Sequence, residues 1–272
     1  MVLTSNEAMR ICAWRGAQSK MNAQQYNDEM EELLREWKAA ADTKGTPFIS
    51  DGVMNPEKWF AQADRPLFLL KEAYGGERDW DLARDHIMRD SQDGKLPKIW
   101  QRISLWAYGV LTGKYRLPGT YLPGDQEFQR FGNRFLQGIA AVNLKKYCGQ
   151  KTSDKDELMR YAFKDREFLR RQIALCDPTV IVCGNTGDAL AQLYDFGKAE
   201  QRNEEYFYHF TLNGHEVLVL DYYHPANQYP EIMNYFALMS VFQHAKMDQH
   251  LRFCEEIEKQ KERAPRDPAQ ES

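Results

Sequence analysis

The sequence has few cysteines, no long apolar run and no excess of positive charge. Its five cysteines, at positions 12, 148, 176, 183 and 254, are odd in number and widely spaced, which indicates reduced thiols in a cytoplasmic protein rather than a disulfide framework. No apolar run has the length of a membrane span, and the N-terminus lacks the pattern of a secretory signal. A net charge of −4 argues against indiscriminate coating of nucleic acid, although a local basic patch can still bind DNA.

What the sequence does contain is typical of a globular α/β protein. Hydrophobic residues make up 43% of the chain, which is enough to bury a sizeable core. Short apolar runs predict four buried strands, over residues 67–70, 138–144, 179–183 and 216–221. Because helical patterns separate these runs, we expect a three-layer α/β/α sandwich around a central, mostly parallel four-stranded sheet.

The same patterns divide the chain into three parts. Residues 1–45 are expected to form an N-terminal helical extension, residues 46–245 the α/β domain, and residues 246–272 a charged tail that is first helical and then disordered after Ala264. Helices are predicted over residues 22–41, 56–63, 80–89, 96–108, 126–137, 153–174 and 231–245, and an ordered loop with two Pro-Gly steps over 114–125.

Polar side chains of chemically useful types follow three of the four predicted strands. Glu72 follows the first strand, Asn143 ends the second and His224 follows the fourth. The carboxyl ends of parallel strands lie at one edge of the sheet, where open α/β sheets bind ligands, so these groups are expected to converge across a cleft. Gly75 and Gly76, just after Glu72, allow a tight turn or close approach to a ligand.

Three short motifs occur at these strand ends: Lys71-Glu72-Ala73-Tyr74-Gly75, Asn143-Leu144-Lys145-Lys146 and His224-Pro225-Ala226-Asn227. Their order and placement resemble the uracil-DNA glycosylase superfamily, and the strand that ends at Gly184 resembles the strand-Gly turn of that family. The resemblance covers residues 67–227 and implies a uracil-DNA glycosylase-like fold. It also implies a monofunctional, metal-independent DNA glycosylase, which flips a base out of DNA and hydrolyses its N-glycosidic bond to leave an abasic site.

The resemblance assigns a role to each residue at the strand ends. The carboxylate of Glu72 would stabilise the cationic sugar and orient water, and His224 would donate a hydrogen bond to the departing base. Asn143 would read the Watson–Crick edge of a pyrimidine. Trp80 is expected to stack on the flipped base, and Tyr229 is expected to act as a wedge.

The resemblance also bears on the substrate. The favoured register places Gly75 at the last position of the family's Gly-Glu-Ala-Pro-Gly motif, where the uracil-specific form has a Tyr that blocks C5 substituents; a shift by one places Tyr74 there instead. An open pocket favours a bulky modified pyrimidine, with glucosylated 5-hydroxymethylcytosine in phage DNA as the best candidate, as in phage-defence members of the superfamily. Uracil repair is an alternative. The four cluster-binding cysteines of that branch have no counterparts, so we expect no cofactor.

Further residues are candidates for DNA contacts. Lys145 and Lys146 are predicted to line a DNA groove or, alternatively, to lie in a solvated loop. Asn227 follows the His-Pro turn, in which Ala226 occupies the position of the family's Ser. Gly184 and Asn185 open a helix and suit either a phosphate contact or an ordinary tight turn. With the wedge Tyr229, the candidate DNA-contacting residues are Lys145, Lys146, Gly184, Asn185, Asn227 and Tyr229.

Other chemistry is less well supported by the sequence. Lys71 is interpreted as a surface or phosphate-contacting residue rather than a Schiff-base nucleophile. His209 and His215 lack compact ligand spacing, so no metal site is predicted. We expect DNA as the partner of a monomer without membrane contact. Two other classes stay open: a non-catalytic nucleic-acid-binding module and a hydrolase of free nucleosides or nucleotides.

Overall fold

The computed structural model describes residues 21–41, 46–75, 77–88, 96–114, 134–149, 153–195 and 206–263. Its strands are β1 (Ile49–Ser50), β2 (Gly52–Val53), β3 (Pro66–Tyr74), β4 (Trp80–Asp81), β5 (Ala140–Gly149), β6 (Val180–Gly184), β7 (Phe207–Leu212) and β8 (His215–Tyr222). Its helices are α2 (Ala23–Ala40), α3 (Pro56–Ala61), the π-helix η1 (Leu82–Met88), α5 (Lys98–Thr112), α7 (Lys155–Lys164), α8 (Arg166–Cys176), α9 (Gly187–Leu193) and α10 (Glu231–Arg263).

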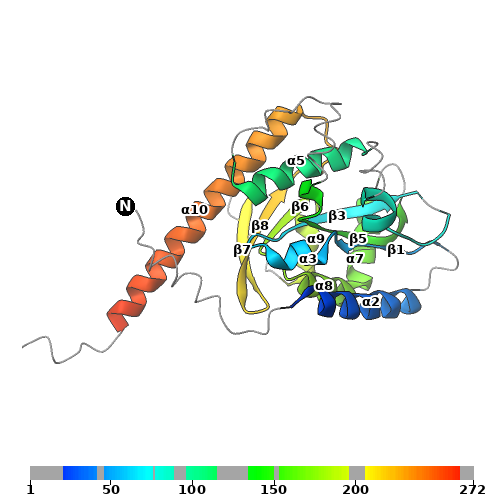
Figure 1. Ribbon diagram of the computed structural model, residues 1–272, viewed down its shortest axis with the longest axis horizontal. Helices are drawn as coiled ribbons and strands as arrows, with labels where there is room; N and C mark the ends of the chain where they lie inside the picture. Colours follow the sequence, from blue (N-terminus) through cyan, green and yellow to red (C-terminus); the bar gives the residue numbers. More distant parts are fainter. Residues whose placement is uncertain are drawn as a thin grey trace, which may run out of the picture.

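A mostly parallel sheet forms the centre of the protein (Figure 1). Within the described residues it has six strands in the order β2-β5-β3-β6-β8-β7, so the predicted count of four is wrong. The four predicted strands are the inner ones, β3, β5, β6 and β8, and each is parallel to its inner neighbours. The two additional strands, β2 and β7, pair antiparallel at the edges.

The β7–β8 hairpin has a signal that is visible in the sequence. Asn213 and Gly214 connect the two strands and both have positive φ, of 49° and 76°. An Asn-Gly pair favours this type of tight turn, because both residues adopt left-handed backbone conformations at low energetic cost. The turn therefore determines the register of the edge strand.

The order of the inner strands defines a topological switch point. The chain passes from β3 to β5 on one side and then crosses to β6 on the other side of β3. In open α/β sheets, ligands bind outside the carboxyl ends of the strands at such a point. The crevice between the ends of β3 and β6 is therefore the place where a site is expected.

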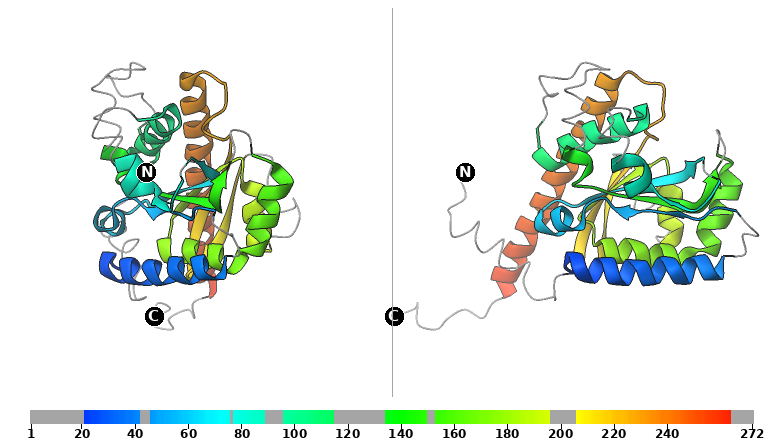
Figure 2. Two further views of the ribbon diagram at one scale, coloured as in Figure 1. Left: turned by 90° about the vertical axis from the view of Figure 1, so that its right-hand side faces the viewer. Right: turned by 45° about the vertical axis from the view of Figure 1, so that its right-hand side comes forward.

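Helices cover both faces of the sheet (Figure 2). Helices α5 and α10 pack on one face around Trp106, Phe68 and Tyr235, while α2, α7, α8 and α9 pack on the other. Helix α2, which the sequence assigns to an N-terminal extension, belongs to this second core, because Leu33 and Trp37 are fully buried. A capping box at Asn22 begins the helix.

Several helices differ from their predicted limits. The single helix predicted over residues 153–174 is two helices, α7 and α8, interrupted at Asp165. The segment predicted as a helix over residues 80–89 begins as strand β4 and continues as the π-helix η1. Helix α10 runs for 33 residues, so the helical part of the tail continues the preceding helix, and its end projects from the body (Figure 1).

Some predictions fall outside the described residues. They are the loop over residues 115–125, most of the helix over residues 126–137 and the tail after Ala264. Among the helices that the structure describes, none combines the length and apolarity needed to cross a membrane.

Candidate active site at the carboxyl edge of the sheet

Strand β3 and the turn after β8 both approach Gly184, the last residue of β6. A Cβ atom at this position would lie 3.1 Å from Leu70 Cδ2 and 3.2 Å from Pro225 Cδ. Strand β3 at Leu70, where its pairing with β6 ends, and the turn after β8 therefore meet beside the end of β6, and a side chain at Gly184 would press against both. The next residue along β3 is Lys71, and the residue before Pro225 is His224, so the structure brings both to the switch point.

His224 is held as a neutral imidazole with one defined tautomer. Its Nδ1 atom accepts a hydrogen bond from the backbone N–H of Ala226 at 3.1 Å, so the proton of the neutral ring is carried by Nε2. Burial, and then the positive charge of Lys71, lower the pKa of His224 from 6.5 to about 4. At neutral pH this side chain is therefore a hydrogen-bond donor without a charge.

Arg102 of α5 fixes the turn that carries His224. Its buried guanidinium donates hydrogen bonds to the carbonyl oxygens of Pro225 at 2.6 Å, Asn227 at 2.8 Å and Tyr229 at 3.3 Å, and it pairs with Glu231 at the start of α10. Sequence analysis missed this residue, although an arginine within the largely apolar segment of α5 is a signal, because a buried charge needs partners.

Asn227 and Asn234 complete the support of the turn. The side chain of Asn227 donates to the carbonyl oxygen of His224 at 2.9 Å and accepts from the backbone N–H of Tyr229 at 3.0 Å. The amides of Asn227 and Asn234 also bond to each other. Asn227, predicted as a DNA contact, thus braces the loop from within, whereas the ring of Tyr229 is exposed, as a wedge requires.

Glu72 lies at the same edge but faces β5. Its carboxylate forms an ion pair with Lys145 at 3.1 Å, and both side chains are 7% exposed. The carboxylate lies so close to Gly149 that a Cβ there would overlap it. Burial lowers the pKa of Lys145, but its hydrogen bonds to Glu72 and Glu157 outweigh this effect and raise the pKa above the ordinary value. Lys145 therefore stays charged and keeps a positive charge beside Glu72.

Asn143 belongs to a buried polar network rather than to an open cavity. Its backbone N–H and its side-chain amide both donate to Asp51 Oδ2, at 2.9 Å and 3.0 Å. Asp51 also accepts from Gln172 at 3.0 Å and pairs with Lys146. The base-reading role expected for Asn143 finds no support in this geometry, because its amide is buried and already bonded.

The prediction that Lys145 and Lys146 line a DNA groove is wrong. Strand β5 continues to Gly149 instead of ending at Leu144, so both lysines lie within the sheet and are buried. Lys146 is fully buried over the ring of Trp37, and burial lowers its pKa. Each ammonium group is neutralised by a carboxylate of the protein, so neither is available to a phosphate.

Gly75 and Trp80, which follow the first motif, are linked by a hydrogen bond. Gly75 has a φ of +92°, which favours glycine, and apart from its two chain neighbours no described residue has an atom within 4 Å of where a Cβ would stand. Its carbonyl oxygen accepts a hydrogen bond from Trp80 Nε1 at 3.0 Å. Trp80 is half-buried against the α5 face, and Tyr74 ends β3 with its backbone paired to Gly149. Whether Gly75 lies in the base pocket, as the favoured register places it, stays a prediction.

Asn185 lies beside this edge in a strained turn. It is exposed with a φ of +58°, and its backbone N–H donates to the carbonyl oxygen of Tyr222 at 2.8 Å. This bond links the turn after β6 to the end of β8. The same N–H also lies 2.9 Å from the carbonyl oxygen of Cys183, as in an ordinary tight turn. Whether Asn185 or Gly184 also contacts a phosphate stays a prediction.

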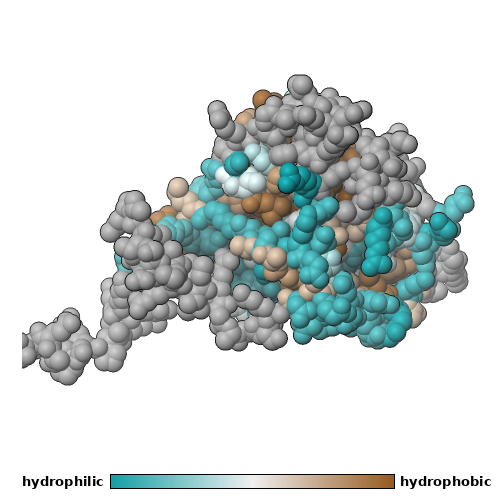
Figure 3. Space-filling view, viewed as in Figure 1, coloured by the Kyte–Doolittle hydropathy of each residue, from teal (hydrophilic) through white to brown (hydrophobic). Residues whose placement is uncertain are grey.

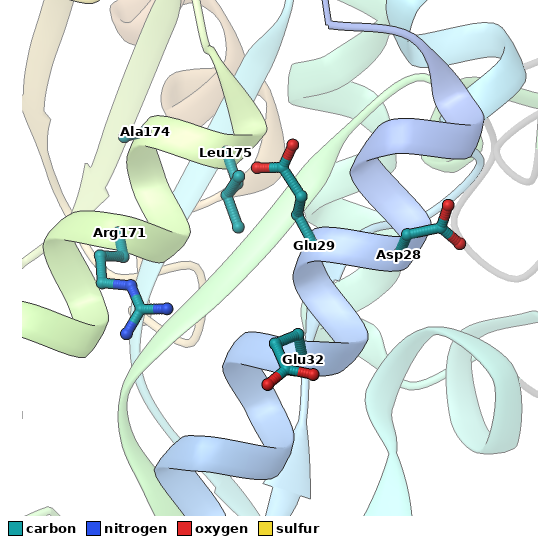
Figure 4. Close-up of a pocket in the computed structure, with 6 residues that line it drawn as sticks. All are labelled: Asp28, Glu29, Glu32, Arg171, Ala174 and Leu175. Carbon is teal, nitrogen blue, oxygen red and sulfur yellow. The ribbon is translucent and has the colours of Figure 1, made fainter.

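A groove lies elsewhere, between α2 and α8. It has a volume of about 500 Å³ and is lined by Asp28, Glu29, Glu32, Arg171, Ala174 and Leu175. In Figure 4, Glu29 points toward Leu175 while Asp28 points away from α8. Figure 3 shows hydrophilic side chains over α2. The three carboxylates of the groove between α2 and α8 would repel phosphate. Because α8 ends at the amino edge of the sheet, the groove also lies away from the carboxyl edge, and we do not assign DNA binding to it.

Two further results bear on the chemistry. Within the ranges that the structure describes, no group of three or more His, Cys, Asp or Glu side chains is arranged to hold a metal ion. Comparison with models of known protein families gives no match, and neither does comparison with curated proteins.

Proposed function

We propose that this protein is a DNA glycosylase, which flips a modified pyrimidine out of DNA and hydrolyses its N-glycosidic bond. The observation that carries the proposal is the neutral His224, held at the switch point with an Nε2–H that has no hydrogen-bond partner among the described residues. When the glycosidic bond breaks, its electron pair moves to the base. The Nε2–H of His224 is already in place to donate a hydrogen bond to that anion and stabilise it.

Glu72 supplies the second part of the chemistry. Its carboxylate, paired with Lys145, lies near the carboxyl end of β3, which β6 separates from β8, and it can stabilise positive charge on the sugar. Water then attacks C1′ and gives its proton to this carboxylate, while the base departs with the electron pair. The ion pair orients Glu72 through Lys145, which in turn contacts Glu157 at 3.2 Å.

The open space at Gly75 supports a substrate with a bulky C5 substituent. In the uracil-DNA glycosylase superfamily, which the motifs resemble, a Tyr at this position restricts the pocket to uracil. Glucosylated 5-hydroxymethylcytosine in phage DNA is therefore our best candidate, and it would connect the protein with phage defence.

The test is an abasic-site assay on duplex and single-stranded DNA containing uracil, 5-hydroxymethylcytosine or its glucosylated form. Replacing Glu72→Gln should lower the excision rate by about 10²- to 10⁴-fold, which is the usual contribution of a catalytic acid or base. Glu157→Gln is the matched control, because Glu157 contacts the same lysine but lies on α7, and it should retain activity. Cleavage of uracil DNA alone would identify a repair enzyme instead.

A second candidate is a non-catalytic nucleic-acid-binding module. It is favoured by the internal bonds of Glu72 and Asn143, which occupy groups that a glycosylase would use. This function predicts that no DNA in the panel acquires abasic sites and that Glu72→Gln leaves DNA binding unchanged.

A further inference from the structure

Three exposed tyrosines surround the turn that carries His224. The exposed fractions are 56% for Tyr206, 44% for Tyr223 and 52% for Tyr229, whereas most aromatic rings of the described residues are buried in the two cores. The rings of Tyr223 and Tyr229 lie 5.4 Å apart at an interplanar angle of 66°, and Tyr206 is close enough to raise the pKa of Tyr223. They therefore form one continuous group, which we call the tyrosine cluster.

The backbone holds Tyr206 in this exposed position at an energetic cost. Its φ is +64°, which is unusual for a bulky side chain. Its carbonyl oxygen accepts a hydrogen bond from the backbone N–H of Asp221 at 2.8 Å, which anchors the residue to the end of β8. Residues in such conformations persist only where the surrounding structure compels them, and they concentrate at functional sites.

Exposed apolar side chains also occur at the start of α10, a few residues after Tyr229. Ile232, Met233 and Phe236, in the first turns of the helix after Tyr229, are exposed by 52%, 59% and 36%. Scattered exposed apolar residues need no explanation, but these three share one face of a helix that begins close to the candidate site, and such a group indicates a binding surface.

We propose that the tyrosine cluster is a stacking platform for unpaired nucleotides that flank the target base, so that the protein takes its substrate from single-stranded or locally opened DNA. This inference rests on the proposed function and specifies its substrate. Tyr223 precedes His224 directly, so the cluster lies beside the position proposed for the flipped base, where nucleotides joined to that base could contact the rings. Aromatic rings stack on any base, and such contacts account for much of the affinity of single-strand-binding proteins.

The experiment measures binding of the full chain to a fluorescently labelled, unmodified single-stranded oligonucleotide by anisotropy, with a duplex of the same sequence in parallel. Tyr223→Ala should weaken single-strand binding by about tenfold, in line with the loss of one stacked base. Tyr223→Phe keeps the ring and should bind within about twofold of the wild type. Phe163→Ala is the matched control, because Phe163 is a 69% exposed aromatic residue on α7, on the opposite face of the sheet from α10.

The dependence on salt provides a second readout. Tyrosine is uncharged, so the ratio of the wild-type and Tyr223→Ala dissociation constants should stay the same between 50 and 200 mM salt, about the range over which phosphate contacts weaken strongly. Equal affinities of the wild type and Tyr223→Ala for the single strand would overturn the inference. So would a change from dimer to monomer in Tyr223→Ala on size-exclusion chromatography, which would identify the cluster as an interface between two copies.

Failure of the inference and failure of the proposed function can be told apart. The binding assay uses DNA without a modified base, so it gives a result whether or not any base is excised. If excision occurs but the tyrosine variants bind normally, the glycosylase stands and the platform does not. If the tyrosine variants lose binding but no base is released, the platform stands on a non-catalytic module.

Discussion

The buried pair formed by Asp51 and Lys146 allows the most stringent test of the structure. Both side chains are 0% exposed, and Lys146 Nζ also donates to the carbonyl oxygen of Asn143 at 2.8 Å. Lys146→Met would remove the ammonium group and leave the carboxylate of Asp51 buried with only amide donors. Breaking a buried ion pair from one side costs about 3–5 kcal/mol.

This loss should be measurable by urea denaturation and by thermal unfolding. For a chain of this size it corresponds to a decrease in Tm of roughly 6–20 °C. Asp51→Asn should cost a similar amount, because it leaves the ammonium group of Lys146 without a counter-charge. The double variant should lose less than the sum of the two, with a coupling free energy of about 2 kcal/mol or more, since removing both charges leaves no unpaired ion.

Lys155→Met is the control for the charge itself. Lys155 pairs with Asp188 at 3.2 Å on the surface, where the side chains are 76% and 58% exposed, so its loss should change stability by less than about 1 kcal/mol. If Lys146→Met is as harmless as Lys155→Met, or if it weakens DNA binding without a loss of stability, the burial described here is incorrect and Lys146 is again a candidate for DNA contact.

Three further predictions concern the turn that carries His224. The free energy of unfolding should decrease as the pH falls from 6.5 to about 4, by at most about 3 kcal/mol, because in this window the unfolded chain binds a proton that the folded His224 excludes. Denaturation curves of His224→Gln should lack this component. The excision activity of the wild type should be lost near pH 4 instead of pH 6.5. Arg102→Met should cost about 3–5 kcal/mol in urea denaturation, since it leaves Glu231 and three carbonyl groups without their donor, and an unchanged midpoint would show that the turn does not need this brace. Gly184→Val should lower the excision rate more than it lowers Tm, because its side chain would push Pro225 away from Leu70; equal activity of the variant and the wild type would exclude convergence at this point.

The inner strands were predictable because a strand buried on both faces needs a continuous apolar run, which is a local property of the sequence. The runs at Leu67, Thr179 and Glu216 each correspond to an inner strand: β6 and β8 differ from the prediction by one residue at each end, whereas β3 continues to Tyr74. The edge strands were missed for the opposite reason. Strand β2 has two residues and exists only because β5 lies beside it, and β7 requires the hairpin at Asn213 to be recognised first.

At the strand ends, the sequence predicts which residues lie at the edge of the sheet but not which way their side chains point. That Glu72 and His224 lie at one edge of a parallel sheet follows from the order of strands and helices, and the sequence by itself determined it. Which way the side chains point depends on groups far away in the chain: Lys145 turns Glu72 toward β5, and Asp51 holds Asn143 and Lys146 inside the protein. The local sequence around a lysine does not show whether its side chain is solvated or buried. Only the tertiary structure decided that question, because the free energy of a buried charge depends on which partners the fold brings to it.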